Sequence, residues 1–320
     1  MVYSVRIRVR TRFSVASGGA SFAAGIAVRL LTRSELPMVS VNRKFLTLAA
    51  VLAFTCVVAH AAPPELIPVG NTSNKSDATG YGAVSYEYKI GKYEVTNAEY
   101  CEFLNAVAKN DPYELYDGRM GAWNPDAEQW GGIERNGPPG SFTYKVIAGN
   151  GKRPVNFVTW QSAARYCNWL NSGDTEKGIY NLGVEPLKLP KHAELAKGEK
   201  PTWVLPTEDE WYKAAYYDAS KAGYWRYPGK SDEPSQANIG SNQPTEGGTS
   251  GPASAYGTFD QGGNVWEFNE SRYEGKAGLR GSSFWIADNA GYMDSFTRYD
   301  DFCGKWPHYG FRVAAVGGAK

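Results

Sequence analysis

The stretch Tyr256-Gly257-Thr258-Phe259-Asp260-Gln261-Gly262-Gly263-Asn264-Val265-Trp266-Glu267-Phe268 combines three glycines with two carboxylates and a large indole. Because glycine adopts backbone conformations that other residues avoid, this composition predicts a tight loop rather than a helix or a regular strand. Asp260 and Glu267 bracket the loop, and a calcium ion binds carboxylate and backbone carbonyl oxygens. The stretch therefore fits a calcium loop. It also fits a solvated turn anchored by Trp266, since the spacing is not that of an EF-hand.

The N-terminal region has the composition of a targeting segment. Residues 1–61 carry seven Arg and one Lys against a single acid, so the rest of the chain has a net charge of −6. Arg43-Lys44 precede the apolar run Phe45–Val58, and Ala59-His60-Ala61 is typical of a signal-peptidase site. The run is shorter than the ~20 apolar residues of a membrane anchor. We therefore predict export through a cleaved signal peptide, with Met38 as an alternative start and no transmembrane anchor in the mature chain.

Composition indicates a loop-rich domain after this segment. Aromatic residues make up 14% of the chain, and it holds 36 Gly and 18 Pro. Such a composition favours irregular structure held by large rings over a helical bundle. We predict a polar linker over residues 62–81 and one domain over residues 82–320. The acidic mature chain does not favour a nucleic-acid partner.

Three threonines precede apolar residues at helical spacing, and each predicts a helix start. Thr96 and Thr207 are each followed three residues later by a Glu, which forms a capping box. The third N-cap is Thr159. The predicted helices begin at Asn97, Trp160 and Glu208, and the first two end near Lys109 and Asn171.

Strand predictions are weaker and shorter. Alternating polar and apolar residues predict strands over Tyr86–Ile90 and Lys92–Val95, divided at Gly91. A further strand is expected within Phe142–Ile147. Residues 221–320 alternate short apolar pieces with Gly, Pro, Asn and Ser, which predicts short strands between long ordered loops.

The small number of Cys and His residues limits which disulfides and metal sites the chain can form. The predicted mature chain has three Cys, which allow at most one disulfide of undetermined pairing: Cys101, Cys167 and Cys303. Cys167 lies on the apolar face of its helix, so we interpret it as a core thiol. Only His192 and His308 remain, which excludes a three-His metal site, and a site with two His and one carboxylate would need both.

Six motifs occur in an order that resembles the sulfatase-modifying-factor domain of formylglycine-generating enzymes, from about residue 66 to the end. They are Tyr93-Glu94-Val95-Thr96-Asn97, Pro154-Val155-Asn156-Phe157-Val158-Thr159-Trp160, Leu205-Pro206-Thr207-Glu208-Asp209-Glu210-Trp211, Gly263-Asn264-Val265-Trp266-Glu267, Leu279-Arg280-Gly281-Ser282-Ser283-Phe284 and Gly310-Phe311-Arg312. The resemblance implies an α+β fold, a C-type-lectin-like variant that is rich in loops and has little regular structure.

The resemblance also implies calcium ligands in the glycine-rich loop. The matching positions are the side chains of Asp260 and Glu267 and the carbonyls of Gly263 and Val265. This spacing is sensible for one loop that wraps around an ion. A second calcium site of the family would use Asn238 and Ile239, in the segment Ala237-Asn238-Ile239, and the sequence does not identify its other ligands.

The catalytic residues of the family are not matched. Its oxidase converts a sulfatase Cys to formylglycine with two Cys thiolates that hold copper, just after an Arg-Gly-Gly-Ser segment. In the corresponding cleft, which includes Ser283 and Trp285, these places hold Ile286 and Gly291. Neither side chain can bind copper, because soft sulfur ligands select Cu(I). The sequence therefore predicts loss of the oxidase activity and makes a copper cofactor improbable.

Two functional hypotheses remain open. In the first, the chain is an exported, calcium-stabilised binding module for a polypeptide or glycan, with ligand contacts from the cleft aromatics Trp285, Tyr292, Tyr299 and Trp306. Core packing is the alternative role of these rings. In the second hypothesis, the chain is an oxidoreductase that acts on a thiol through a rearranged metal site at Cys303 and His308. The iron enzymes of ergothioneine synthesis, another branch of the family, carry their ligands in an N-terminal helical domain that we do not find before residue 66.

Overall fold

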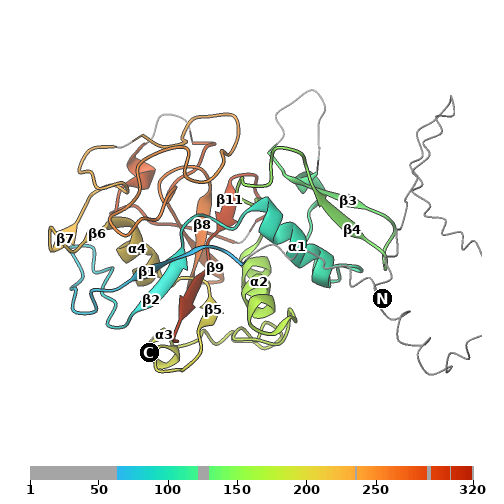
Figure 1. Cartoon of the computed structure of the whole chain (residues 1–320), viewed down its shortest axis with the longest axis horizontal. Helices are drawn as coiled ribbons and strands as arrows, with labels where there is room; N and C mark the ends of the chain where they lie inside the picture. The colour runs from blue at the N-terminus through green and yellow to red at the C-terminus, as the bar shows by residue number, and fades with distance from the viewer. Residues whose placement is uncertain (1–62, 122–129, 235, 287–289, 303, 319–320) are drawn as a thin grey trace, which may run out of the picture. The chain divides into compact units, whose positions relative to one another are not determined.

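The computed structural model describes residues 63–121, 130–234, 236–286, 290–302 and 304–318, where it confirms an α+β, loop-rich fold (Figure 1). The predicted signal segment and Cys303 lie outside these ranges. In chain order the elements are β1 (Leu66–Val69), β2 (Tyr88–Gly91), α1 (Asn97–Val107), η1 (Gly118–Met120), β3 (Ile133–Asn136), β4 (Thr143–Val146), α2 (Trp160–Ser172), α3 (His192–Leu195), β5 (Thr202–Val204), α4 (Glu208–Tyr216), β6 (Tyr217–Asp218), β7 (Gly223–Tyr224), β8 (Trp266–Tyr273), β9 (Lys276–Arg280), η2 (Ala290–Met293), β10 (Tyr299–Asp301), β11 (Tyr309–Phe311) and β12 (Ala314–Val316). Over the described ranges, no helix is long and apolar enough to cross a bilayer.

Two four-stranded sheets form the framework. The first has the order β1-β2-β12-β5, and its neighbouring strands are all antiparallel. The second has the order β10-β9-β8-β11, in which β11 runs parallel to β8. Since β11 and β12 are separated only by Arg312 and Val313, the chain passes from one sheet to the other at these two residues.

The segment predicted as a linker is partly a strand. Within residues 62–81, β1 pairs with β2 at the edge of the first sheet, with Pro68 opposite Lys89. Proline lacks an N–H donor and is tolerated in edge strands. A four-residue strand with a proline carries too little alternation to be recognised in the sequence.

The predicted strand over Lys92–Val95 is wrong. Its backbone groups are paired with four separate segments rather than with one neighbouring strand. The Lys92 N–H donates to Glu65 and its carbonyl accepts from the Phe259 N–H. The Val95 N–H donates to Phe311, and the Val95 carbonyl accepts from Val155. This segment therefore joins loops that are far apart in the sequence.

The helix starts are confirmed at all three threonines. Thr96 and Thr207 each form both hydrogen bonds of a capping box, and Thr159 accepts from the Ser162 N–H. Helix α2 ends at Gly173, whose φ of 78° is the left-handed conformation expected of a helix C-cap. These contacts lie within one helical turn, which explains why the sequence sufficed to predict them.

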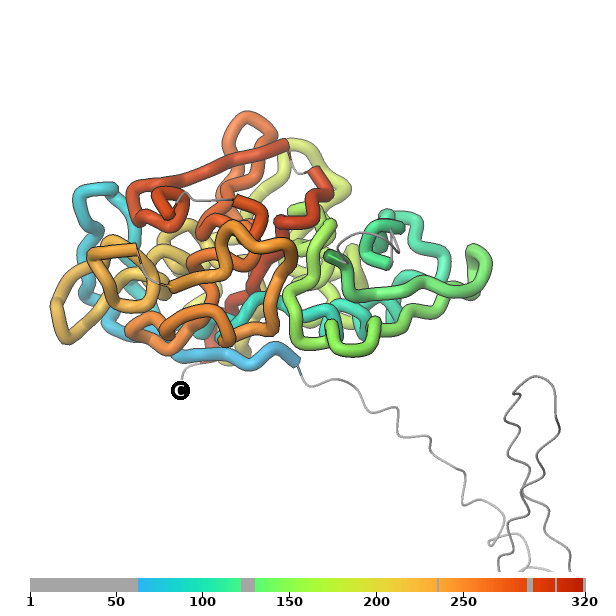
Figure 2. The backbone as a smooth tube through the Cα atoms, turned by 90° about the horizontal axis from the view of Figure 1, so that it is seen from above, coloured from blue at the N-terminus to red at the C-terminus, as the bar shows by residue number. Residues whose placement is uncertain are grey.

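Aromatic rings fill the core between α1 and α2. The rings of Phe103 and Tyr166 meet edge to face at a centroid distance of 5.3 Å, and Tyr166 also contacts Phe311 of the second sheet. Cys167 and Cys101 are buried and form no disulfide, which confirms Cys167 as a core thiol. Figure 1 shows α4 on one side of β8 and β9, and α1 and α2 on the other. In Figure 2 the orange part of the tube, which follows α4, runs mostly through irregular loops, as predicted.

Candidate functional site

The glycine-rich stretch forms a tight loop up to the start of β8, as predicted. Positive φ angles occur at Asp260 (59°), Gly263 (86°) and Asn264 (57°). At Gly263 a glycine is required, because a Cβ atom there would lie 2.7 Å from the carbonyl oxygen of Asn238. The loop thus closes directly against the segment that carries Asn238.

Glu267 forms a buried ion pair with Arg312. The Arg312 guanidinium donates to both carboxylate oxygens at 2.6 Å, and both side chains are fully buried. The Trp211 indole donates to the same carboxylate at 2.7 Å, and Arg312 also donates to the carbonyls of Gly91 and Phe259. This pair joins β8, α4, the glycine-rich loop and the crossing point between the two sheets.

Glu94 adds a third carboxylate to this region. It is 3% exposed, its Oε1 accepts from the Asn264 amide at 3.0 Å, and its Oε2 is buried without a hydrogen-bond partner. Burial raises the pKa of Glu94 well above its ordinary value, and the negative charges of Asp260 and Glu267 raise it further. Burial and the neighbouring carboxylates thus favour the protonated form of Glu94, and only Glu267 pairs directly with Arg312.

Asp260 lies in a buried, polar environment. Asp260 is 8% exposed, and burial raises the pKa of its carboxyl. It accepts from the Gly248 N–H at 2.5 Å and lines a cavity of about 10 Å³, about the volume that one water molecule needs. Among the described residues, no group of three or more His, Cys, Asp or Glu side chains is placed to hold a metal ion. Glu267 is the least available of the predicted ligands, because Arg312 and Trp211 already occupy its oxygens.

The second predicted calcium position lies beside the first. Asn238 forms an isolated bridge with Gly263, and its carbonyl accepts from the Asn264 N–H at 2.8 Å. The Asn238 amide donates to Gln243 and Asn264, while its side-chain oxygen accepts from Ser241 at 2.5 Å. Ile239 donates its N–H to the carbonyl of Ala237. The side chain of Asn238 therefore serves mainly to join two loops.

Four rings form an aromatic cluster, which consists of Trp130, Trp285, Trp306 and His308. Trp130 and Trp285 meet edge to face at 4.7 Å, and the His308 ring is nearly parallel to Trp285 and Trp306 at 6.0 and 6.2 Å. Trp285 is 47% exposed and Trp306 is 49% exposed. Burial lowers the pKa of His308 to about 4 despite the opposing charge of Asp301, so its ring is neutral at pH 7.

The other two predicted cleft rings do not belong to this cluster. Tyr292 and Tyr299 pack against Trp266 at centroid distances of 5.8 and 5.4 Å. Tyr292 is partly buried in this contact, in line with the core-packing alternative, whereas Tyr299 is 43% exposed.

The positions that correspond to the copper ligands hold Ile286 and Gly291, on either side of a segment outside the described ranges. Ile286 donates its N–H to Ser283 and its carbonyl accepts from the Gly240 N–H. Ser283 is fully buried and its hydroxyl has no hydrogen-bond partner. Gly291 lies in η2 and its carbonyl accepts from Thr297.

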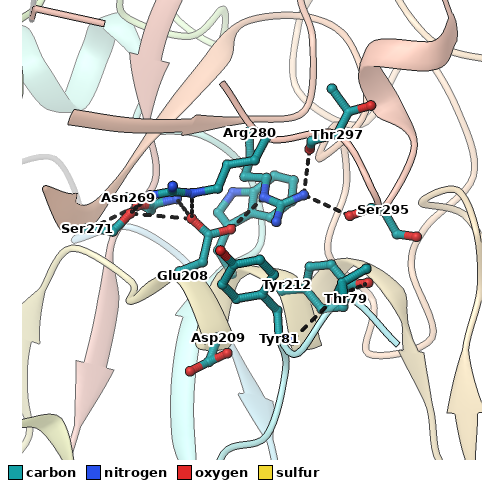
Figure 3. Close-up of polar contacts among 12 residues, drawn as sticks. Thr79, Tyr81, Glu208, Asp209, Tyr212, Asn269, Ser271, Arg280, Ser295 and Thr297 are labelled. Carbon is teal, nitrogen blue, oxygen red and sulfur yellow. Dashed lines mark hydrogen bonds and ion pairs between the residues drawn. The ribbon is translucent and has the colours of Figure 1, made fainter. Parts of the chain in front are cut away.

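A buried ion pair lies at the end of β9 (Figure 3). Glu208, the first residue of α4, accepts from Arg280 at 2.5 Å and from Asn269 at 2.8 Å. The other side of the Arg280 guanidinium donates to the carbonyls of Ser295 and Thr297 at 2.9 and 2.5 Å. Arg280 thus joins the segment after η2 to the end of β9 and to α4.

His192 forms a second buried charged group, separate from the aromatic cluster. Its Nδ1 lies 2.9 Å from each oxygen of Glu210, and its Nε2 lies 3.0 Å from Glu270. Tyr86 donates to Glu210 and Tyr180 to Glu270. Burial alone would lower the pKa of His192, but the charges and hydrogen bonds of the two carboxylates outweigh it and raise the pKa to about 10. The ring is therefore an imidazolium that joins α3, α4 and β8.

Sequence reasoning missed Glu94, Asn156 and Trp130 as site residues. Glu94 and Asn156 lie inside motifs that carry the family resemblance, so their presence in those motifs was the available signal. Trp130 lies in a Gly- and Pro-rich segment without periodicity, which gives no signal of its spatial neighbours.

Comparisons with known proteins identify the family. The profile of the sulfatase-modifying factor enzyme 1-like domain matches residues 66–316. The chain therefore belongs to this family, and its fold is the loop-rich α+β fold of formylglycine-generating enzymes that the sequence predicted.

The sequence identity to individual proteins is low. A hercynine oxygenase of Mycolicibacterium smegmatis (strain ATCC 700084 / mc(2)155) is 28% identical over 202 residues, which cover 58% of this chain and 37% of that protein. The chain thus matches well under half of this relative's length. Similar solved structures are the variable protein 1 of Treponema denticola (TM-score 0.47, 21% identity, 78% of this chain and 94% of that one) and CarF (0.49, 20%, 79% and 98%). PvdO from Pseudomonas aeruginosa is also similar (0.46, 17%, 79% and 92%).

Proposed function

We propose that this chain is an exported member of the family that lacks cysteine-to-formylglycine oxidase activity and acts as a calcium-stabilised binding module. The observation that carries the proposal is Ile286 and Gly291 at the positions of the two copper-binding thiols. Export is supported by the segment that ends at Ala61, and N-terminal sequencing of the secreted protein should then begin at Ala62. A product that retains the segment would contradict export.

Without the thiol pair, the cleft lacks the ligands that the oxidase needs. Cu(I) prefers soft sulfur ligands, and Ile286 and Gly291 supply none. The exposed rings of Trp285 and Trp306 supply contact area for a ligand.

The copper affinity tests this proposal. In competition with a Cu(I) chelator, the mature wild-type protein should take up no copper, because no thiol pair is present at positions 286 and 291. The double variant Ile286→Cys and Gly291→Cys restores the family's ligand positions and should bind about one copper per chain. Wild-type uptake that equals that of the double variant would contradict the proposal.

A second candidate function is oxidation of a thiol through a rearranged metal site near Cys303. It is favoured by the similarity to a protein named hercynine oxygenase and by the unpartnered Nδ1 of His308. This function requires wild-type copper or iron uptake that is lost in Cys303→Ala. Unchanged metal content in that variant would exclude it.

Calcium is the structural ion that we propose for the glycine-rich loop. Asp260 and the carbonyls of Gly263 and Val265 would hold it, and Glu94, whose Oε2 has no hydrogen-bond partner, would be a further ligand. A bound cation would stabilise the ionised forms of these carboxyl groups. Its role is to fix the loop rather than to take part in a reaction.

This proposal predicts calcium-dependent melting. Calcium at about 100 times its Kd stabilises a protein by about 2.7 kcal/mol, which raises the Tm of a domain of this size by on the order of 5–10 °C. Glu94→Gln should melt higher than wild type in chelator, because it removes a buried carboxylate, and should respond less to calcium. Glu65→Gln, at an exposed carboxylate, is the matched control. Wild-type protein that melts identically in calcium and in chelator would rule out the ion.

A further inference from the structure

A surface groove of about 600 Å³ lies between segments that are distant in the sequence: residues 73–78, Tyr217 with residues 222–226, and the pair Ser295-Phe296. Its described lining includes neither a ring of the aromatic cluster nor Ile286 or Gly291. The groove is therefore a candidate site apart from the one proposed above, and its occupant would be a second ligand of this chain.

Asp294 fixes an arginine and an aromatic ring at the wall of this groove. Its Oδ2 accepts from the Arg226 Nε at 2.7 Å, and its Oδ1 accepts from the Phe296 N–H at 3.0 Å. Asp294 is 7% exposed, whereas Phe296 is 67% exposed and the side chain of Arg226 is 56% exposed. The two terminal nitrogens of Arg226 form no hydrogen bond to any residue that the structure describes. The buried carboxylate thus orients the guanidinium and leaves its two terminal nitrogens open to a ligand.

The acids that line the groove are already held by the protein. Asp232 accepts from the Lys221 ammonium at 3.2 Å and from the Arg226 N–H at 3.1 Å. Both oxygens of Asp77 accept from hydroxyl groups of neighbouring side chains. Lys75 also lines the groove, and its ammonium has no hydrogen-bond partner within the described ranges. The charged groups left to bind a ligand are therefore two cations, which favour an anionic group.

We propose that this groove binds a uronate, which is a sugar that carries a carboxylate. A planar guanidinium matches a carboxylate through two parallel hydrogen bonds. The exposed ring of Phe296 can pack on the C–H face of a sugar. Ser73 and Ser76 line the groove and are exposed, and their hydroxyls, which bond to no described residue, can pair with sugar hydroxyls.

An acidic peptide fits the groove less well. Extended peptides are held mainly by hydrogen bonds to the edge of a strand. The strands at this groove are β6 and β7, which are two residues long and already pair with each other. The wall over residues 73–78 contains no strand. A ligand bound through side chains, as a sugar is, therefore suits the groove better than one bound through its backbone.

The test is uronate binding by the mature protein, measured by isothermal titration calorimetry at low ionic strength. The probes are the trimers of galacturonate, glucuronate and mannuronate, each beside the neutral trimer with the same linkage. At least one uronate trimer should bind about tenfold more tightly than its neutral counterpart, because only the uronate accepts from the guanidinium. Arg226→Lys keeps a positive charge beside Asp294 but loses the planar fork, so it should weaken uronate binding about tenfold. Phe296→Ala should weaken it as well.

Matched controls are Arg119→Lys, at a partly exposed ion pair with Asp117 outside the groove, and Tyr273→Ala, at an exposed ring outside it. Both should leave uronate binding unchanged. The inference would be overturned if no uronate trimer bound, if neutral trimers bound equally well, or if neither groove variant weakened binding.

Benzoate and tri-aspartate carry carboxylates without a sugar ring and test the ligand class. Binding of either one as tightly as the best uronate trimer would show that the carboxylate alone is recognised and would overturn the assignment to a sugar. Weak or no binding of both supports it. The copper titration fails independently of these results, because it reports on positions 286 and 291 and needs no saccharide.

Discussion

Arg312→Leu is expected to destabilise the protein by about 3–5 kcal/mol, because it leaves the fully buried carboxylate of Glu267 without its charge partner. The substitution also removes hydrogen bonds to the carbonyls of Gly91 and Phe259. The measurement is the free energy of unfolding in a denaturant titration.

A surface ion pair supplies the control for this variant. Lys152 lies 2.7 Å from Glu246 and both side chains are exposed, so Lys152→Leu should cost less than about 1 kcal/mol. Glu267→Gln combined with Arg312→Leu should be more stable than the sum of the two single effects, because the pair is removed together. Equal costs for Arg312→Leu and Lys152→Leu would show that the buried ion pair does not stabilise the fold as described above.

His192→Phe is expected to have a similar cost, about 3–5 kcal/mol, because it leaves Glu210 and Glu270 buried around a ring that cannot carry a positive charge. Lys197→Ala removes an exposed pair with Glu194 and is the control, with an expected cost below about 1 kcal/mol. Denaturant titration at pH 7 measures both. A cost for His192→Phe within the control's range would contradict a charged His192 ring between Glu210 and Glu270.

The charged His192 ring also makes the stability of the protein depend on pH. The pKa of His192 is raised to about 10 in the folded protein, against about 6.5 in the unfolded chain. Its contribution to stability is therefore fully present below about pH 6.5 and is lost as the pH rises toward 10. Nuclear magnetic resonance of the mature protein should find the His192 ring still protonated at pH 8, while His308 is neutral. A His192 ring that titrates near pH 6.5 would contradict the assignment.

The local parts of the fold were predictable from the sequence. Thr96, Thr159 and Thr207 start helices through contacts that lie within one turn, and the glycine-rich stretch forms its loop because of backbone preferences. Contacts between distant residues were not predictable. His192 meets residues 18 and 78 positions away, at Glu210 and Glu270.

The candidate site shows the same division. Asp260 and Glu267 were singled out by their spacing, yet the partner of Glu267 is Arg312, 45 positions further on. The correspondence of Ile286 and Gly291 to the family's thiols was inferred from an ordered series of motifs and stays a prediction. The unpartnered oxygen of Asn156 could not be predicted, because it depends on carbonyls of Trp130 and Pro307 that only the folded chain brings together.

The loss of oxidase chemistry is tested most directly by turnover of a peptide that contains the sulfatase Cys motif. The mature protein from Ala62 is loaded with Cu(I), supplied with oxygen and the peptide, and the peptide's mass is measured beside an active enzyme of the family. We predict an unchanged mass, because Ile286 and Gly291 cannot hold the copper ion. Conversion of the peptide Cys to formylglycine would contradict this account and would direct attention to Cys303 as a copper ligand.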